Sequence, residues 1–140
     1  MEIRQLSTDE EIKATYPVMN QLRHHLKKES YPTTVRRMAD SDGYRLAAAF
    51  EGERVCCVAG YRISEFLAYG KVLYVDDLVT DEAARSRDFG GHMIGWLANE
   101  AQRHGCGQLH LDSSVQRHDA HRFYFREGMK ISSYHFVKDF

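Results

Sequence analysis

The chain has 140 residues, 43% of them apolar and 28% charged, and its net charge is −1. This size and balance predict a single globular domain over residues 1–140 with an apolar core of its own. A general nucleic-acid binder would carry a clear excess of basic residues, and a membrane span would need about 18 consecutive apolar residues. The sequence has neither feature, so we expect a protein that binds no nucleic acid and no membrane.

The cysteines and the first residues indicate the compartment. Cys56, Cys57 and Cys106 match neither a disulfide framework nor a zinc motif. The N-terminal residues lack the basic and then apolar pattern of a signal peptide. We therefore expect free thiols and a cytoplasmic protein.

The first third of the chain predicts one strand and two helices. Residues 2–6 favour a short strand. Ser7 and Thr8 can cap a helix whose first turn is acidic, as the helix dipole favours. Apolar residues at three- and four-residue spacing extend this helix to about Leu26, with Pro17 expected to shorten or kink it. A second, short helix is predicted over 33–39.

In the rest of the chain, the spacing of the apolar residues changes from that of strands to that of a helix and back. Strands are predicted over 44–50, 54–63 and 71–80, and a glycine-containing turn between the first two favours an antiparallel meander. A helix follows that carries an apolar stripe around Met93 and is placed to end at Gly105. The last elements expected are a strand over 108–112, a helix over 119–127 and one or two strands within 129–139. This order predicts an α/β fold with a mixed, mostly antiparallel sheet and helices on both faces.

The segment 85–97, RSRDFGGHMIGWL, opens the long helix and has the features of an anion site. A helix N-terminus offers free backbone N–H groups and a partial positive charge to a phosphate or pyrophosphate. Gly90 and Gly91 allow a ligand to approach closely, and Arg85 and Arg87 add charge. The glycine spacing matches neither a nucleotide-triphosphate loop nor a dinucleotide fingerprint. Taken alone, the segment is equally typical of an arginine-rich turn that caps a helix.

This segment resembles the signature Arg/Gln-x-x-Gly-x-Gly/Ala of the GNAT acetyltransferase family. Aligned by the apolar helix positions, the signature falls on Arg85, Asp88 and Gly90, so an aspartate stands where the family has its first glycine. An alignment shifted to Arg87 fits the helix stripe less well. An aspartate beside a pyrophosphate is electrostatically unfavourable unless its side chain turns away or caps the helix.

A second marker follows in the segment 117–129, RHDAHRFYFREGM. It is similar to the family's Ala-x-x-Phe/Leu-Tyr-x-x-x-Gly-Phe at Ala120, Phe123, Tyr124, Gly128 and Met129. The family's usual Asn, three residues before the Ala, is Arg117 here. The two matched stretches cover roughly residues 71–140, and the second is most similar to aminoalkylphosphonate N-acetyltransferases.

The resemblance implies the GNAT fold with splayed strands 71–80 and 108–112, and acetyl-coenzyme A as the acetyl donor. The pantetheine arm would lie along the open strand edge, against the backbone of Leu78, Val79 and Thr80. Arg117 or Arg126 would reach the adenosine 3′-phosphate. The other coenzyme-binding positions it implies are Arg85, Arg87, Asp88, Phe89, Gly90, Gly91, Ala120 and Tyr124.

Acetyl transfer to an amine needs a base for the ammonium and an acid for the departing thiolate. Tyr124 is the candidate acid, because a phenol with a pKa near 10 is protonated at neutral pH; a core tyrosine on an amphipathic helix is the alternative. Asp76 and Asp77, inside an apolar strand, are the candidate bases. Adjacent strand residues face opposite sides, so only one should face a given pocket. We prefer Asp76, working through water; either carboxylate could instead bind the ammonium or have a structural partner.

These residues predict acetyl transfer to the primary amine of a small molecule, with an aminoalkylphosphonate or a polyamine as candidate acceptors. Acetylation of a protein N-terminus or lysine, and a non-catalytic acyl-coenzyme A sensor, are the alternatives. The histidine pairs at 24–25 and 118/121 have no third ligand nearby in sequence, so we expect no metal. Edge strands at the C-terminus would be compatible with a homodimer.

Overall fold

The computed structural model describes residues 1–140, which form two compact units, Met1–His110 and Leu111–Phe140. The first unit carries nearly all of a five-stranded sheet with the order β1-β2-β3-β4-β5, and the second begins at the last residue of β5. The strands are β1 (Glu2–Gln5), β2 (Arg45–Glu51), β3 (Arg54–Phe66), β4 (Gly70–Thr80) and β5 (Gln108–Leu111).

The sheet is an antiparallel meander extended by one crossover. β1 pairs with β2, β2 with β3, and β3 with β4, each time antiparallel. A single turn of 3-10 helix (Glu82–Ala84) and the helix α3 (Phe89–Arg103) then lead to β5. This arrangement confirms the predicted mixed α/β architecture.

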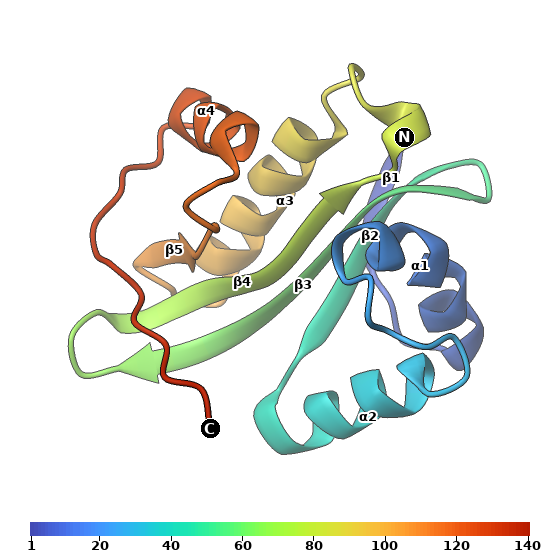
Figure 1. Ribbon diagram of the computed structural model, residues 1–140, viewed down its shortest axis with the longest axis horizontal. Coiled ribbons are helices and arrows are strands. Elements are labelled where there is room, and N and C mark those ends of the chain that lie inside the picture. Colours follow the sequence, from blue (N-terminus) through green and yellow to red (C-terminus); the bar gives the residue numbers. More distant parts are fainter. The chain divides into compact units, whose positions relative to one another are not determined.

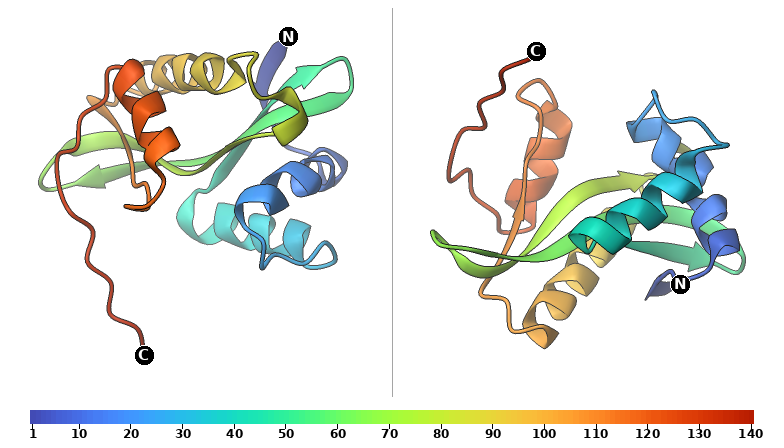
Figure 2. Two further views of the ribbon diagram at one scale, coloured as in Figure 1. Left: turned by 45° about the horizontal axis from the view of Figure 1, so that its top comes forward. Right: turned by 90° about the horizontal axis from the view of Figure 1, so that it is seen from below.

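Helices cover both faces of the sheet in the first unit (Figures 1 and 2). α1 (Asp9–Leu22) and α2 (Tyr31–Asp42) lie on one face, and α3 lies on the other. β2 and the first part of β3 are covered on both sides, so residues 46–50 and 55–61 are buried without a break. The core under α1 and α2 includes Ile12, Met19, Val35, Leu46, Val58 and Val79.

The first two helices begin and end for local reasons. Thr8 caps α1, and Glu11 bonds back to the Thr8 amide in a capping box. α1 contains Pro17 and ends at Leu22, earlier than the expected end near Leu26. α2 is longer than predicted and ends at Asp42; Gly43 caps it, with a φ of +70° that is a left-handed conformation. None of the helices combines the length and apolar character needed to cross a bilayer.

The second unit contains α4 (His118–Arg126), which agrees with the predicted helix 119–127. Gly128, with φ of +81°, follows it as expected. The prediction of strands within 129–139 is wrong, because residues 129–140 form no strand. Their apolar and aromatic residues satisfy strand propensity, but a strand exists only where another backbone pairs with it. The homodimer was inferred from these strands and stays a prediction.

Candidate functional site

The N-terminal turn of α3 has the features of an anion site. The first hydrogen bond inside the helix runs from the His92 amide to the Asp88 carbonyl. The amides of Phe89, Gly90 and Gly91 therefore have no partner within the helix. The Phe89 side chain is buried and anchors the turn. Free donors at the positive end of a helix dipole can bind a phosphate.

Asp88 precedes this turn in a left-handed conformation, with φ of 56° and ψ of 32°. Glycine adopts this conformation at no steric cost, and Asp tolerates it better than most residues. The backbone thus explains why a glycine suits this position. The Asp88 side chain makes no capping hydrogen bond, and a Cβ built on Gly91 would lie 2.4 Å from its Oδ1. A negative charge therefore stands beside the amides that would bind a diphosphate.

The two arginines of the turn differ in availability. Arg87 forms an ion pair with Glu51 at the end of β2, and its guanidinium lies 5.2 Å from the centre of the Phe89 ring. The hydrogen bonds from Arg87 lower the pKa of the Glu51 carboxyl, which keeps the pair charged. Arg85 is exposed, and no carboxylate of the chain pairs with it. Arg85 is therefore the arginine of this turn that a ligand can engage without breaking an ion pair.

The far half of β4 has an open edge. The Gly107 amide donates to the Lys71 carbonyl at 2.9 Å, which sets where β5 joins β4. β5 has only 4 residues, so it cannot follow β4 over its 11 residues. Leu78, Val79 and Thr80 pair with β3 on their other side. Their second edge is the place where an extended, amide-containing arm could add.

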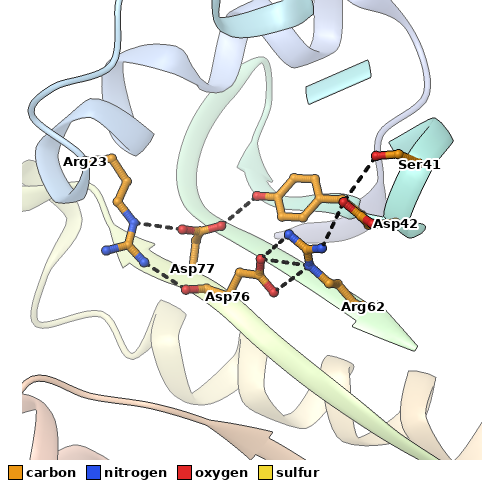
Figure 3. Close-up of polar contacts among 7 residues, drawn as sticks. Arg23, Ser41, Asp42, Arg62, Asp76 and Asp77 are labelled. Atoms are coloured by element: carbon orange, nitrogen blue, oxygen red, sulfur yellow. Dashed lines mark hydrogen bonds and ion pairs between the residues drawn. The ribbon is translucent and has the colours of Figure 1, made fainter. Parts of the chain in front are cut away.

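A β-bulge in β4 brings the two aspartates together. Gly60 pairs with Asp77 and Tyr61 with Val75, so Asp76 is the extra residue. Both carboxylates join one connected polar network with Arg23, which follows α1, and with groups from α2 and β3 (Figure 3). The expectation that they face opposite sides is wrong, because the period of two holds only where the strand is regular.

Asp77 is held from two directions. Arg23, just after α1, donates from Nε to its Oδ1 at 2.8 Å, and the Tyr44 hydroxyl donates to its Oδ2 at 2.7 Å. Arg23 Nη2 also donates to the Asp76 carbonyl at 2.9 Å, so one guanidinium spans the bulge. Burial and the adjacent Asp77 charge raise the pKa of Tyr44 well above its usual value, so its hydroxyl remains a donor.

Asp76 is bound by one arginine through two oxygens. Arg62 Nε lies 3.1 Å and 2.9 Å from the two carboxylate oxygens, and Arg62 Nη2 lies 2.8 Å from Oδ2. Burial raises the pKa of Asp76, although the hydrogen bonds from Arg62 oppose that rise. Arg62 also lies 3.7 Å from the Asp42 carboxylate at the end of α2.

Sequence reasoning missed Arg23, Tyr44 and Arg62, which come from three other parts of the chain. The signal that could have pointed to them is Gly60, inside β3. A Cβ at Gly60 would lie 1.8 Å from the Tyr44 hydroxyl oxygen and 2.6 Å from Asp77 Oδ2. A glycine within a strand often marks a bulge or a close approach, and here it marks both.

Tyr124, the candidate acid, lies on α4 and is half-buried, with its ring centre 5.3 Å from that of Phe123. Burial raises the pKa of Tyr124, and the positive charge of Arg117 at the helix N-cap opposes the rise. The phenol therefore keeps its proton at neutral pH, as a general acid must. Ala120 lies in the first turn of the same helix.

The histidines form a pair but gather no metal site. The rings of His118 and His121 on α4 lie 5.9 Å apart, edge to face. His121 Nε2 is 2.8 Å from the Ser114 carbonyl, so one of its nitrogens is engaged. Nowhere in the chain do three or more His, Cys, Asp or Glu residues come together as metal ligands would.

The model of the acetyltransferase (GNAT) family matches residues 5–129 of the chain. The chain belongs to the GNAT family. The match contains both the turn before α3 and the helix that carries Tyr124, so the resemblance drawn from the two short markers is confirmed. It includes α1 as well, which the markers did not reach.

Individual relatives agree with this assignment. The chain is 33% identical over 137 residues to an uncharacterized N-acetyltransferase, YhdJ, of Bacillus subtilis, covering 97% of this chain and 96% of that protein. It is 36% identical over 64 residues to the aminoalkylphosphonate N-acetyltransferase of Salmonella typhimurium, covering 46% of this chain and 42% of that protein. The fold matches that of AAC(6')-Iy in complex with a coenzyme A bisubstrate analog, with a TM-score of 0.85, 13% identity, and coverage of 99% of this chain and 96% of the other.

GNAT enzymes use acetyl-coenzyme A, and the residues of the α3 turn fit its diphosphate with one exception. Three unpaired amides and Arg85 supply donors and positive charge, and the open edge of β4 suits an amide-containing arm. The exception is Asp88, whose charge opposes that of the diphosphate.

Proposed function

We propose that this GNAT enzyme transfers the acetyl group of acetyl-coenzyme A to the primary amine of a small molecule, by direct attack in a ternary complex. The candidate acceptors are aminoalkylphosphonates and polyamines. The observation that carries the proposal is the α3 turn, where three free amides and an unpaired arginine form an anion site within the region matched by the family.

The reaction is balanced within the two substrates. The neutral amine nitrogen attacks the thioester carbonyl carbon, an N–C bond forms, and the C–S bond breaks. The amine loses one proton to a base, and the coenzyme A thiolate takes up one proton. The protein must therefore remove a proton at one end of the reacting centre and supply one at the other.

Two residues are proposed for these proton transfers, and a third supports them. Tyr124 supplies the proton to the thiolate, supported by its position in the family marker and its raised pKa. Asp76 is the preferred base, acting through water, because burial raises its pKa. Asp77 is held by Arg23 and Tyr44, which suits it to fixing the bulge and the local charge.

The remaining contacts proposed are with the coenzyme. Arg85 and the amides from Phe89 to Gly91 bind the diphosphate, while Arg87 contributes if it exchanges Glu51 for the ligand. The backbone of Leu78, Val79 and Thr80 pairs with the pantetheine arm. Arg117, Ala120 and Tyr124 are proposed to contact the coenzyme from the second unit, with Arg126 as the other candidate for the 3′-phosphate.

An amine panel tests the proposal. The purified protein is incubated with acetyl-coenzyme A and each amine in turn, free thiol is measured, and the acetylated amine is identified by mass spectrometry. We expect thiol release that depends on an amine and matches the product mole for mole. Thiol release that no amine increases, or coenzyme binding without any acetylated product, would refute the proposed function.

A further inference from the structure

The carboxylates of the β4 bulge are already neutralised by arginines of the chain. Arg62 forms an ion pair with both carboxylate oxygens of Asp76, and Arg23 forms an ion pair with Asp77. The remaining carboxylate of the network, Asp42, is 59% exposed and shares Arg62, so water screens its charge. A polyamine site needs carboxylates without a counter-charge, and this bulge leaves no such carboxylate for a second ammonium group.

Arg23 has donors to spare. A guanidinium carries five N–H groups in a planar fork. The bonds to Asp77 and to the Asp76 carbonyl use Nε and Nη2, while Nη1 donates to no group of the chain. The Arg23 side chain is 42% exposed, so this unused edge faces solvent. Such an edge can bind a carboxylate, sulfonate or phosphonate through two hydrogen bonds.

The residues after Arg23 extend this positive charge. His24, His25, Lys27 and Lys28 are all exposed, and the only acidic residue within the sequence 24–30 is Glu29. The segment is held in place although it is not helical. Asn20 Nδ2 donates to the carbonyls of Arg23 and His24, and the Tyr16 hydroxyl donates to the Leu26 carbonyl at 2.8 Å. The basic segment 23–28 thus offers an ordered cationic surface, and its first residue, Arg23, contacts the β4 bulge.

We propose that the acceptor carries an anionic group as well as its primary amine, and that Arg23 is the residue that selects for it. The anion binds the free edge of Arg23, assisted by the charge of Lys27 and Lys28. The amine, a short linker away, then lies by the bulge at Asp76 and Asp77. This inference rests on the proposed function and chooses between its two acceptor classes. Primary amines that carry a terminal phosphonate, sulfonate or carboxylate are acceptors, and polyamines are poor ones.

Matched acceptors test the inference on the wild-type enzyme. We would compare kcat/KM for 2-aminoethylphosphonate, taurine and β-alanine with that for ethanolamine, propylamine and putrescine, all at saturating acetyl-coenzyme A. At least one anionic acceptor is expected to exceed its neutral counterparts about tenfold or more, the size expected for a charge-assisted hydrogen-bonded pair. The advantage should shrink as NaCl rises, since exposed charges are screened.

Substitutions locate the anion contact. Arg23→Lys keeps a positive charge opposite Asp77 but removes the fork. The ratio of kcat/KM for anionic acceptors to kcat/KM for propylamine should therefore fall several-fold, whatever change the two kinds of acceptor share through the bulge. Lys27→Gln with Lys28→Gln should reduce the preference without touching the bulge. Arg37→Gln, an exposed arginine on α2, removes the same unit of charge elsewhere and should leave the preference unchanged.

The outcomes separate this inference from the function on which it rests. Acetylation of putrescine or propylamine at rates equal to or above those of every anionic acceptor would overturn the inference and leave the acetyltransferase intact. An anionic preference that survives both Arg23→Lys and the Lys27/Lys28 double substitution would overturn the assignment to this segment. Absence of acetylation with every amine would refute the proposed function itself and the inference with it.

Discussion

The negative charge of Asp88 at the start of α3 should weaken coenzyme binding, so removing it should be a gain of function. Asp88 occupies a left-handed conformation that favours glycine, and its carboxylate stands over the first turn of the helix. We consider three substitutions. Asp88→Asn removes the charge and keeps a residue that tolerates this backbone, Asp88→Gly removes both charge and strain, and Asp88→Ala removes the charge but adds strain.

The electrostatic gain can be estimated from Coulomb's law. A diphosphate bound at the first-turn amides would lie about 6 Å from the carboxylate and carry about two negative charges. In water each charge pair at that distance costs about 0.7 kcal/mol, so the total is about 1.4 kcal/mol before screening. At physiological ionic strength the Debye length is about 8 Å, which roughly halves the cost. Asp88→Asn should therefore lower the Kd for coenzyme A about threefold, and nearer tenfold at low salt.

The backbone contribution appears in stability rather than in binding. A non-glycine residue in the left-handed region costs about 1–2 kcal/mol. Glycine avoids this cost, but it loses more conformational entropy on folding, which destabilises the fold by about 0.5–1 kcal/mol. Asp88→Gly should thus stabilise the fold by up to about 1 kcal/mol and raise Tm by a few degrees. Asp88→Ala should bind coenzyme A as Asp88→Asn does, but with a lower Tm.

Calorimetric titration with coenzyme A at low and high NaCl, together with thermal unfolding, tests the series. Asp40→Asn, an exposed aspartate on α2, is the matched control and should change neither quantity. If Asp88→Asn binds coenzyme A no more tightly than wild type at low salt, the carboxylate does not face the diphosphate. If it binds more weakly, Asp88 contributes a favourable contact and the electrostatic argument is wrong.

Three further outcomes are expected. Tyr124→Phe should lower kcat while leaving the calorimetric affinity for acetyl-coenzyme A unchanged, and an unaltered kcat would remove Tyr124 from the chemistry. Gly60→Ala should cost about 3 kcal/mol in urea unfolding, because its Cβ would overlap the buried Tyr44 hydroxyl; wild-type stability would show that the network can shift. Hydrogen bonds from Arg4 and the capping amides lower the pKa of Glu11 to about 2 from a usual 4.5. A lowered folded-state pKa stabilises above pH 4.5 and is lost as the pH falls towards 2, so Glu11→Gln should be less stable than wild type at neutral pH, with a gap that closes over that range rather than staying constant.

Elements that depend on local pattern could be predicted from the sequence. The apolar runs of β3 and β4, the apolar stripe of α3, and Gly128 after α4 each act within a few residues, and each prediction matched the structure to within a few positions. The α3 turn was found for the same reason, since a helix start with glycines and arginines is a local feature. The sequence could not show which arginine of this turn is available to a ligand, because Arg87 pairs with Glu51, which is far away in sequence.

The end of α1 shows how a side chain can override periodicity. The apolar spacing continues to Leu26, and Leu26 does pack against the core, but it does so outside the helix. The Asn20 side chain donates to the carbonyls of Arg23, His24 and Leu26, offering them a partner that a continued helix would have supplied. The turn that results sends the Arg23 side chain to Asp77.

The two aspartates of β4 mark the limit of reading chemistry from one strand. Carboxylates inside an apolar strand are costly, so the sequence alone draws attention to them. Their role depends on the residues that neutralise them, and arginines are too common on surfaces for Arg23 and Arg62 to be singled out in advance. Gly60 provides the missing constraint, because it leaves the space in which the Tyr44 hydroxyl meets Asp77. A chain with the same acidic pair but a larger residue at this position could not hold the same network, so the glycine and the acidic pair must be read together when the acceptor site of a relative is inferred.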